Sequence, residues 1–281
     1  MSKYRRPEFK RNRIIIPLIL LLAIFTLACP PNCPPNCPPP ERERVVLIFS
    51  DVTSSLLQSE SEQVGTLTCD VLDSLPPGTQ YRVYPIQIEG QKLEPMDEGT
   101  IVVNQIPGTT HAVNQARRKK ISDEIKKLYE LIKPVRRADA DGKPDNHTCI
   151  LYTLKFAQNI FKQFDEKNTD FDLIYVSDMI EQCNTTPMGK PISLGQANTS
   201  EEIKLAKETN LNLDLSHARV SMIIPATDAT YTASGRPNPS DLQAFWEAIL
   251  LHCGFSEDSL KNSQKFYFSS GLPRYLKSEG N

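Results

Sequence analysis

The sequence predicts an α/β fold, with a doubly wound, mainly parallel central sheet flanked by helices. Apolar, β-rich runs alternate with amphipathic helical patterns along most of the chain, an order typical of parallel sheets. The run Val45–Phe49 is apolar at every position, as in a strand that is buried on both faces. About 235 residues remain from the start of that run, enough for one sizeable core. We therefore expect a single α/β domain over residues 45–281.

The first half of this domain is predicted to continue with two strands and two long helices. Residues 59–75 carry an apolar stripe with helical spacing, and a Pro-Pro-Gly sequence ends that helix. Strand patterns follow at residues 81–88 and, shorter and expected near an edge, at residues 100–106. A long amphipathic helix is predicted over residues 113–132, ending before Pro134.

The second half repeats the alternation of helices and strands. Its predicted elements are a helix at 150–164, strands at 171–178 and 220–225, a helix at 240–253 and an edge strand at 265–269. An Asn-Pro pair precedes the last helix, as is common at an N-cap and first turn. The pattern therefore favours a parallel sheet to the end of the chain.

Residues 1–28 predict a signal peptide of the lipoprotein type. Six Lys and Arg residues precede Ile14–Ala28, an apolar run of 15 residues that suits a secretory signal and is short for a spanning helix. The run ends Thr26-Leu27-Ala28-Cys29, which resembles a bacterial lipobox with Thr26 where Leu is usual. The resemblance implies lipidation of Cys29, and an uncleaved signal anchor is the alternative. Both place the remaining chain outside the cytoplasm, anchored to a membrane of a bacterial cell envelope.

Residues 29–44 are expected to form a Pro- and Cys-rich stalk. The repeated Pro-Pro-Asn-Cys sequence favours extended polyproline II and cannot build a core. Its cysteines, Cys33 and Cys37, could pair, cross-link two chains or stay free. We expect a semi-rigid tether about 30–40 Å long.

The charge balance argues against nucleic acid as a partner. Removal of residues 1–28 takes six basic residues and one acidic residue from totals of 32 and 34, which leaves a net charge of −7. Proteins that bind nucleic acid are generally basic, because they neutralise phosphates.

Polar side chains follow the opening strand at the point where it ends. Asp51, Thr53 and Ser55 offer one carboxylate and two hydroxyls at a spacing of two residues. Open α/β sheets bind ligands at the carboxyl ends of their strands, and hard cations such as Mg²⁺ prefer oxygen donors. The alternative is that Asp51 or Thr53 only caps the next helix. Thr148, at a helix start, and Asp178, at a strand end, are expected on the same rim.

These residues together resemble the metal-ion-dependent adhesion site of the von Willebrand factor A (VWA) family. That family carries Asp-x-Ser-x-Ser, a distant Thr and a distant Asp; here Thr53 replaces the first Ser, and Met179 stands where Gly is common. The resemblance covers most of residues 45–253. It implies a VWA-like fold, a bound Mg²⁺ (or Mn²⁺ or Ca²⁺) and a protein ligand that offers a carboxylate. The metal ligands that it implies are Asp51, Thr53, Ser55, Thr148 and Asp178.

The predicted function is therefore that of a membrane-anchored, extracytoplasmic binding module that engages a protein partner through a divalent cation, rather than an enzyme. Two alternatives stay open. One is a metal-assisted hydrolase or phosphatase that uses Asp51 and Asp178, and the other is a metal-free scaffold of an envelope complex. The sequence contains no Gly-x-Ser-x-Gly elbow, glycine-rich phosphate loop or His-Glu-x-x-His motif.

Four cysteines lie within the predicted domain, and an extracytoplasmic location permits disulfides. Four buried thiols are the alternative. On the VWA resemblance, Cys149 and Cys183 both lie toward the metal rim, whereas Cys69 and Cys253 lie on the first and last main helices, which are neighbours in that family. The resemblance therefore implies the pairs Cys149–Cys183 and Cys69–Cys253.

Overall fold

The computed structural model divides the chain into two units, Met1–Glu41 and Arg42–Asn281. It describes parts of the second unit only, so the predicted signal peptide and nearly all of the predicted stalk lie outside the described residues. No helix in the described part of the chain is both long and apolar enough to cross a membrane. The described residues are 42–53, 56, 58–86, 93–102, 109–138, 148–181, 200, 204, 213–226, 239–262 and 266–268.

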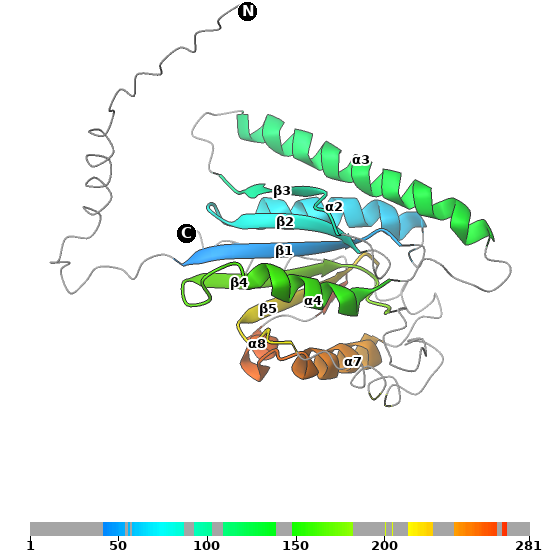
Figure 1. The fold of residues 1–281 in the computed structure, drawn as a ribbon. Coiled ribbons are helices and arrows are strands. Elements are labelled where there is room, and N and C mark those ends of the chain that lie inside the picture. The colour runs from blue at the N-terminus through cyan, green and yellow to red at the C-terminus, as the bar shows by residue number, and fades with distance from the viewer. Residues whose placement is uncertain are drawn as a thin grey trace, which may run out of the picture. The chain divides into compact units, whose positions relative to one another are not determined.

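A six-stranded sheet with the order β3-β2-β1-β4-β5-β6 forms the centre of the second unit (Figure 1). All neighbouring strands are parallel except β2 and β3, which are antiparallel. This arrangement confirms the predicted α/β class with a mainly parallel sheet. The strands are β1 (Glu43–Asp51), β2 (Gln80–Ile86), β3 (Asp97–Thr100), β4 (Thr169–Val176), β5 (Ala218–Ile224) and β6 (Phe266–Phe268).

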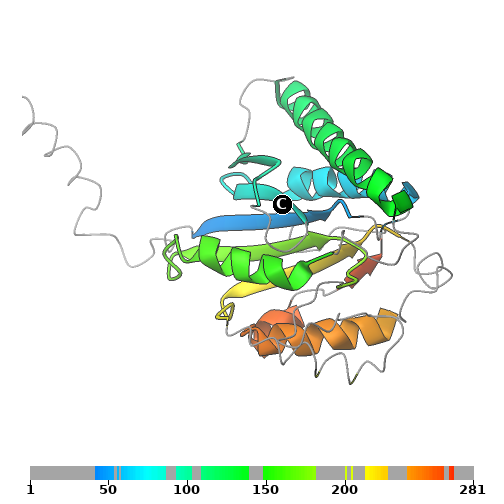
Figure 2. The same ribbon diagram turned by 45° about the vertical axis from the view of Figure 1, so that its right-hand side comes forward.

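Helices cover both faces of the sheet, as a doubly wound fold requires. Side chains of α2 and α3 belong to the apolar core on one face, and side chains of α4, α7 and α8 belong to the core on the other. In both views α2 and α3 lie on the same side of the sheet (Figures 1 and 2). The helices are α2 (Gln58–Ser74), α3 (Thr109–Ala138), α4 (Ile150–Phe161), α7 (Pro239–His252) and α8 (Glu257–Asn262).

Strand β1 is central in the sheet and positions the predicted site. It pairs in parallel with β2 and β4, and every residue from Val45 to Asp51 is buried. Its alternate residues enter the two opposite cores, which explains why the run Val45–Phe49 is apolar throughout. The strand order extends from β1 through β2 to β3 in one direction, and from β4 through β5 to β6 in the other. The carboxyl ends of β1 and β4 therefore form the switch point at which such sheets bind ligands.

The largest differences between predicted and observed bounds concern two elements, and the short helix α8 was not predicted. Strand β3 occupies Asp97–Thr100 rather than residues 100–106, although it is an edge strand as expected. Helix α3 continues to Ala138, past Pro134, where the helix was predicted to end. A proline removes its own amide donor and strains the preceding turn, at about 3 kcal/mol, but the backbone can continue beyond it. Pro134 therefore marks a weakened turn of α3 rather than its end.

An ion network around the buried Asp172 joins the amino-terminal halves of three central strands. Asp172 of β4 is fully buried and accepts hydrogen bonds from Arg44 Nε of β1 and Arg219 Nε of β5, both at 2.7 Å. Just before β1, Arg42 pairs with Asp170 at 2.9 Å. Since parallel strands share their polarity, this network lies toward the sheet edge opposite to the predicted site.

Candidate functional site

Asp51 is the last residue of β1 and is fully buried. Its Oδ1 accepts hydrogen bonds from the backbone N–H of Thr53 at 2.8 Å and from the Thr53 hydroxyl at 2.6 Å. Its Oδ2 accepts a hydrogen bond from the hydroxyl of Ser177 at 2.6 Å. Both carboxylate oxygens are therefore held by neighbouring residues, and the side chain is fixed at the end of the strand.

Thr148 meets Thr53 from a distant part of the sequence. Both side chains are buried, and their hydroxyl oxygens are 2.6 Å apart. Because Thr53 donates its single hydroxyl proton to Asp51, Thr148 is the donor between the two threonines. Thr148 lies just before Cys149, the N-cap residue of α4. The structure thus brings Asp51, Thr53 and Thr148 together on one rim of the sheet.

Ser177 belongs to the same rim, although the sequence analysis did not include it among the candidate ligands. Its hydroxyl donates to Asp51 and accepts the backbone N–H of Met179 at 3.0 Å. It therefore joins the ends of β1 and β4. Ser50 of β1 pairs with Val176 of β4, so the next residues of the two strands, Asp51 and Ser177, are opposite each other. A small hydroxyl residue directly after a buried strand was the signal that could have found it.

Asp178 lies in a tight turn after β4. Its side chain is buried, and its Oδ1 accepts the backbone N–H of Ile180 at 3.1 Å. Met179 has a φ of 61°, in the left-handed region that glycine adopts most readily. Met179 therefore adopts a backbone conformation that glycine would favour. The carbonyl of Met179 accepts the indole N–H of Trp246 at 2.9 Å, so α7 supports the turn.

The oxygen atoms of the rim are of the type that a small, hard cation prefers. Asp51 Oδ1 and Thr148 Oγ1 each lie 2.6 Å from Thr53 Oγ1, distances that are ordinary for O–H···O hydrogen bonds. In the described part of the chain, no cluster of three or more His, Cys, Asp or Glu side chains could hold a metal ion. A cation at this rim would therefore depend on hydroxyl oxygens as well as carboxylates. Ser55, the fifth predicted ligand, lies outside the described residues.

The same contacts weigh against Asp51 as the nucleophile of a hydrolase. An attacking carboxylate needs an oxygen that can approach the substrate. Asp51 is 0% exposed, and both of its oxygens already accept hydrogen bonds. The arrangement therefore favours an electrostatic or structural role for this side chain.

The predicted cysteine pairs have different outcomes. Cys149 is disulfide-bonded, whereas Cys183 lies outside the described residues, so their pairing stays a prediction. Cys69 and Cys253 are both free thiols, and the predicted bond between them is absent. The reason is their position, because Cys69 belongs to the core on the α2 face and Cys253 to the core on the α7 face. Burial raises the pKa of Cys69 to about 11 and that of Cys253 to about 12.

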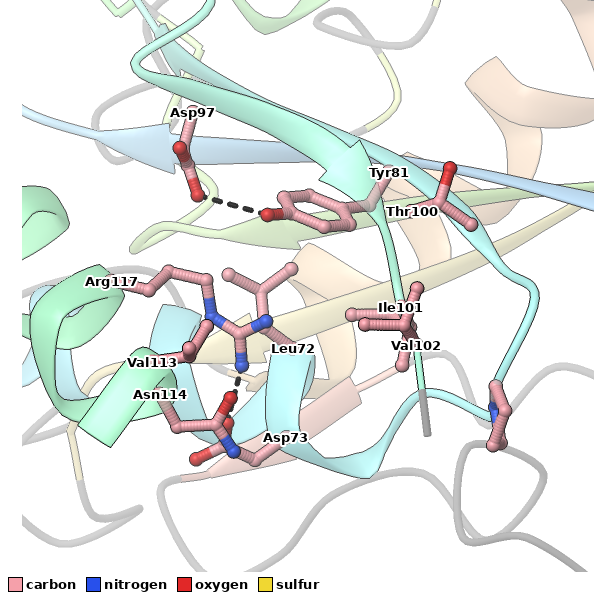
Figure 3. Close-up of a pocket in the computed structure, with 11 residues that line it drawn as sticks. Leu72, Asp73, Tyr81, Asp97, Thr100, Ile101, Val102, Val113, Asn114 and Arg117 are labelled. Atoms are coloured by element: carbon pink, nitrogen blue, oxygen red, sulfur yellow. Dashed lines mark hydrogen bonds and ion pairs between the residues drawn. The ribbon is translucent and has the colours of Figure 1, made fainter. Parts of the chain in front are cut away.

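A hollow of about 450 Å³ lies between the β2–β3 edge of the sheet and helices α2 and α3 (Figure 3). Arg117 donates to Asp73 at 2.6 Å and lies over the Tyr81 ring, 5.9 Å from its centre, while the Tyr81 hydroxyl donates to Asp97 at 3.1 Å. Burial and the Asp97 carboxylate raise the pKa of Tyr81. Tyr81 lies near the start of β2, whereas Asp51 pairs with the last residue of that strand. The hollow is therefore roughly 16 Å along the strand from the rim and is not part of the predicted site.

No protein-family model matches the sequence, and no curated protein matches it. Among solved structures, the chain is similar to a von Willebrand factor type A protein from Catenulispora acidiphila, with 12% identity and a TM-score of 0.40. That match covers 74% of this chain and 37% of the other. The chain is also similar to the SpRpn10 VWA domain, with 12% identity, a TM-score of 0.37, and coverage of 82% of this chain and 90% of the other. At these levels of similarity, function has to be argued from the residues of this chain.

Proposed function

We propose that this chain is a binding module that engages a protein partner through a divalent cation. The proposed ligands are Asp51, Thr53, Ser55, Thr148 and Asp178. The proposal is carried by one observation, the convergence of oxygen atoms from Asp51, Thr53 and Thr148 at contacts of 2.6 Å. They converge where the strand order of the sheet reverses, which is where open α/β sheets bind ligands.

Mg²⁺ is the first choice of cation, because all of these residues offer oxygen donors; Mn²⁺ and Ca²⁺ accept the same donors. Thr53 and Ser55 would contribute neutral hydroxyl oxygens. Asp51 and Asp178 would contribute negative charge, directly or through water. A cation held by few charged ligands stays electrophilic and supplies a position for the carboxylate of an Asp or Glu side chain on the partner.

We also propose that the module works outside the cytoplasm, anchored to a bacterial envelope membrane. Support comes from the basic and then apolar order of residues 1–28 and from the lipobox-like sequence that ends at Cys29. A lipid on Cys29 or an uncleaved signal anchor would hold the chain, and residues 29–44 would separate the domain from the bilayer. The chain has 32 basic and 34 acidic residues, and removal of residues 1–28 takes away six basic and one acidic residue, which leaves a net charge of −7. This negative charge favours protein over nucleic acid as the partner.

Thermal unfolding of the full chain during titration with Mg²⁺ tests the cation site. We expect the unfolding midpoint to rise, because a ligand that binds only the folded state adds about 2.7 kcal/mol of stability at 100 times its Kd. Asp51→Asn should remove this rise. Asp170→Asn is the matched control, since Asp170 is a β4 carboxylate paired with Arg42 toward the opposite sheet edge, and it should keep the rise. A wild-type midpoint that does not move at millimolar Mg²⁺ or Mn²⁺ would refute the cation site and favour a metal-free scaffold.

A further inference from the structure

Helix α4 begins beside the rim without a side-chain cap from its own N-cap residue. Cys149 makes no capping hydrogen bond through its side chain, and its sulfur is part of a disulfide. The first backbone N–H groups of a helix have no acceptor within the helix, and Ser, Thr, Asp or Asn at the N-cap usually supplies one. The start of α4 lies directly after Thr148 and Cys149, so whatever holds this helix end also affects the position of Thr148.

Glu181 supplies an acceptor from a different segment. Its Oε2 accepts the backbone N–H of Leu151, in the first turn of α4, at 2.8 Å, and its side chain is fully buried. A carboxylate is favourable at this point because the helix N-terminus carries partial positive charge, and a hydrogen bond to an ionised acceptor is stronger than a neutral one. Glu181 follows Asp178 by three residues. This bond therefore ties the segment of one proposed cation ligand to the helix that starts beside another.

The segment from Ser177 to Glu181 is also held by two other elements. Ser177 donates to Asp51 at 2.6 Å, which fixes the segment to β1. Trp246 donates to the carbonyl of Met179 at 2.9 Å, which fixes it to α7. Of these three bonds, only the bond of Glu181 joins the segment to α4. It joins the turn after β4 directly to the first turn of α4, beside the indirect link that runs from Ser177 through Asp51 and Thr53 to Thr148.

We propose that Glu181 is a positioning residue of the cation site, which sets the spacing between Asp178 and Thr148 by holding the start of α4. This inference rests on the proposed function. Glu181 acts through its reach to Leu151, not as a ligand. Replacement of a residue that hydrogen-bonds and orients metal ligands typically changes the metal affinity 10–100-fold. Loss of the bond to Leu151 should therefore raise the Kd for the cation by at least about 10-fold.

Two substitutions separate the effect of the length of the Glu181 side chain from the effect of its negative charge. Glu181→Asp keeps the carboxylate but shortens the side chain by one methylene, so it cannot span to the N–H of Leu151. Glu181→Gln keeps the length and an acceptor oxygen but removes the charge. The matched control is Thr153→Val, which removes a buried hydrogen bond of 2.8 Å between the hydroxyls of Thr153, in the same helix turn, and Tyr175, without touching the segment after β4. The measurement is the Kd for Mn²⁺ by calorimetry on the full chain, with unfolding in EDTA as a separate readout.

We expect Glu181→Asp to raise the Kd for Mn²⁺ by at least about 10-fold. The Kd values of Glu181→Gln and Thr153→Val should stay within about threefold of the wild-type value. The inference is overturned if Glu181→Asp binds like the wild type, or if Glu181→Gln weakens binding as much as Glu181→Asp. An equal loss in Thr153→Val would show a general effect of helix stability and would also overturn it. If the wild type itself binds no Mn²⁺, the proposed function fails, which is a distinct result.

Discussion

Replacement of Thr53 by valine removes one hydroxyl that has two partners. Valine matches threonine in size, so the change tests hydrogen bonding rather than packing. The variant loses the hydroxyl bond to Asp51 and the bond from Thr148, both of 2.6 Å. Each net bond is worth about 1 kcal/mol, and the hydroxyl of Thr148, which is buried, loses one of its partners, at a further cost of up to about 2 kcal/mol. We therefore expect the free energy of unfolding without metal to fall by about 2–4 kcal/mol.

Urea unfolding in EDTA measures this loss, provided that the slope with denaturant concentration is unchanged. The matched control is Thr53→Ser, which keeps the hydroxyl and removes one buried methyl at a cost of about 1 kcal/mol. In the presence of Mg²⁺, the serine variant should still be stabilised and the valine variant should not. The reasoning is refuted if valine and serine variants are equally stable in EDTA and respond equally to Mg²⁺.

Two further predictions concern other parts of the fold. Asp172→Asn removes a buried carboxylate shared by two partly buried arginines and should lower the free energy of unfolding by about 2–4 kcal/mol in urea. Asp170→Asn, at an exposed pair, should cost less than about 1 kcal/mol, and equal losses would contradict this prediction. Cys69 and Cys253 should resist iodoacetamide at pH 8 until the protein unfolds, because burial raises their pKa values from 9.0 to about 11 and about 12. These raised pKa values stabilise the folded state below pH 9, and urea titrations at stepped pH should show this contribution being lost from pH 9 to about 11 for Cys69 and to about 12 for Cys253.

The parts of the site that sequence analysis could predict follow from strand polarity. Asp51 and Asp178 each follow a buried apolar run after one intervening serine, and parallel strands end at a common sheet edge, so their placement at one edge needed no knowledge of tertiary contacts. Thr148 could be added because it precedes a strong helical pattern. Ser177 carried a local signal, as a small hydroxyl residue directly after a buried strand, whereas the role of Glu181 depends on contact between distant segments. Glu181 follows the end of β4 by five residues, and no sequence pattern there predicts a buried carboxylate; its burial depends on the start of α4 lying beside it.

The incorrect cysteine pair has a topological cause. Helix α2 lies between β1 and β2 in the chain, and α7 lies between β5 and β6. These two crossovers move in opposite directions along the sheet. Crossovers between parallel strands are nearly always right-handed, which places helices of opposite progression on opposite faces. Cys69 and Cys253 were therefore separated by the sheet once the strand order was set, and the strand order could not be read from local patterns.

The position of β1 has a mechanical consequence. The chain enters this strand at Arg42, which is held to the turn before β4 by hydrogen bonds to the carbonyls of Glu166 and Thr169 at 3.2 and 3.1 Å. Asp51 lies at the other end of the same strand, and parallel ladders to β2 and β4 run between the two. If the proposed anchor before Arg42 and a partner bound at Asp51 were pulled apart, the force would act along the axis of β1. Because both points lie on β1, the tension would run through the covalent backbone of that strand, and the ladders to β2 and β4 would carry little of the load.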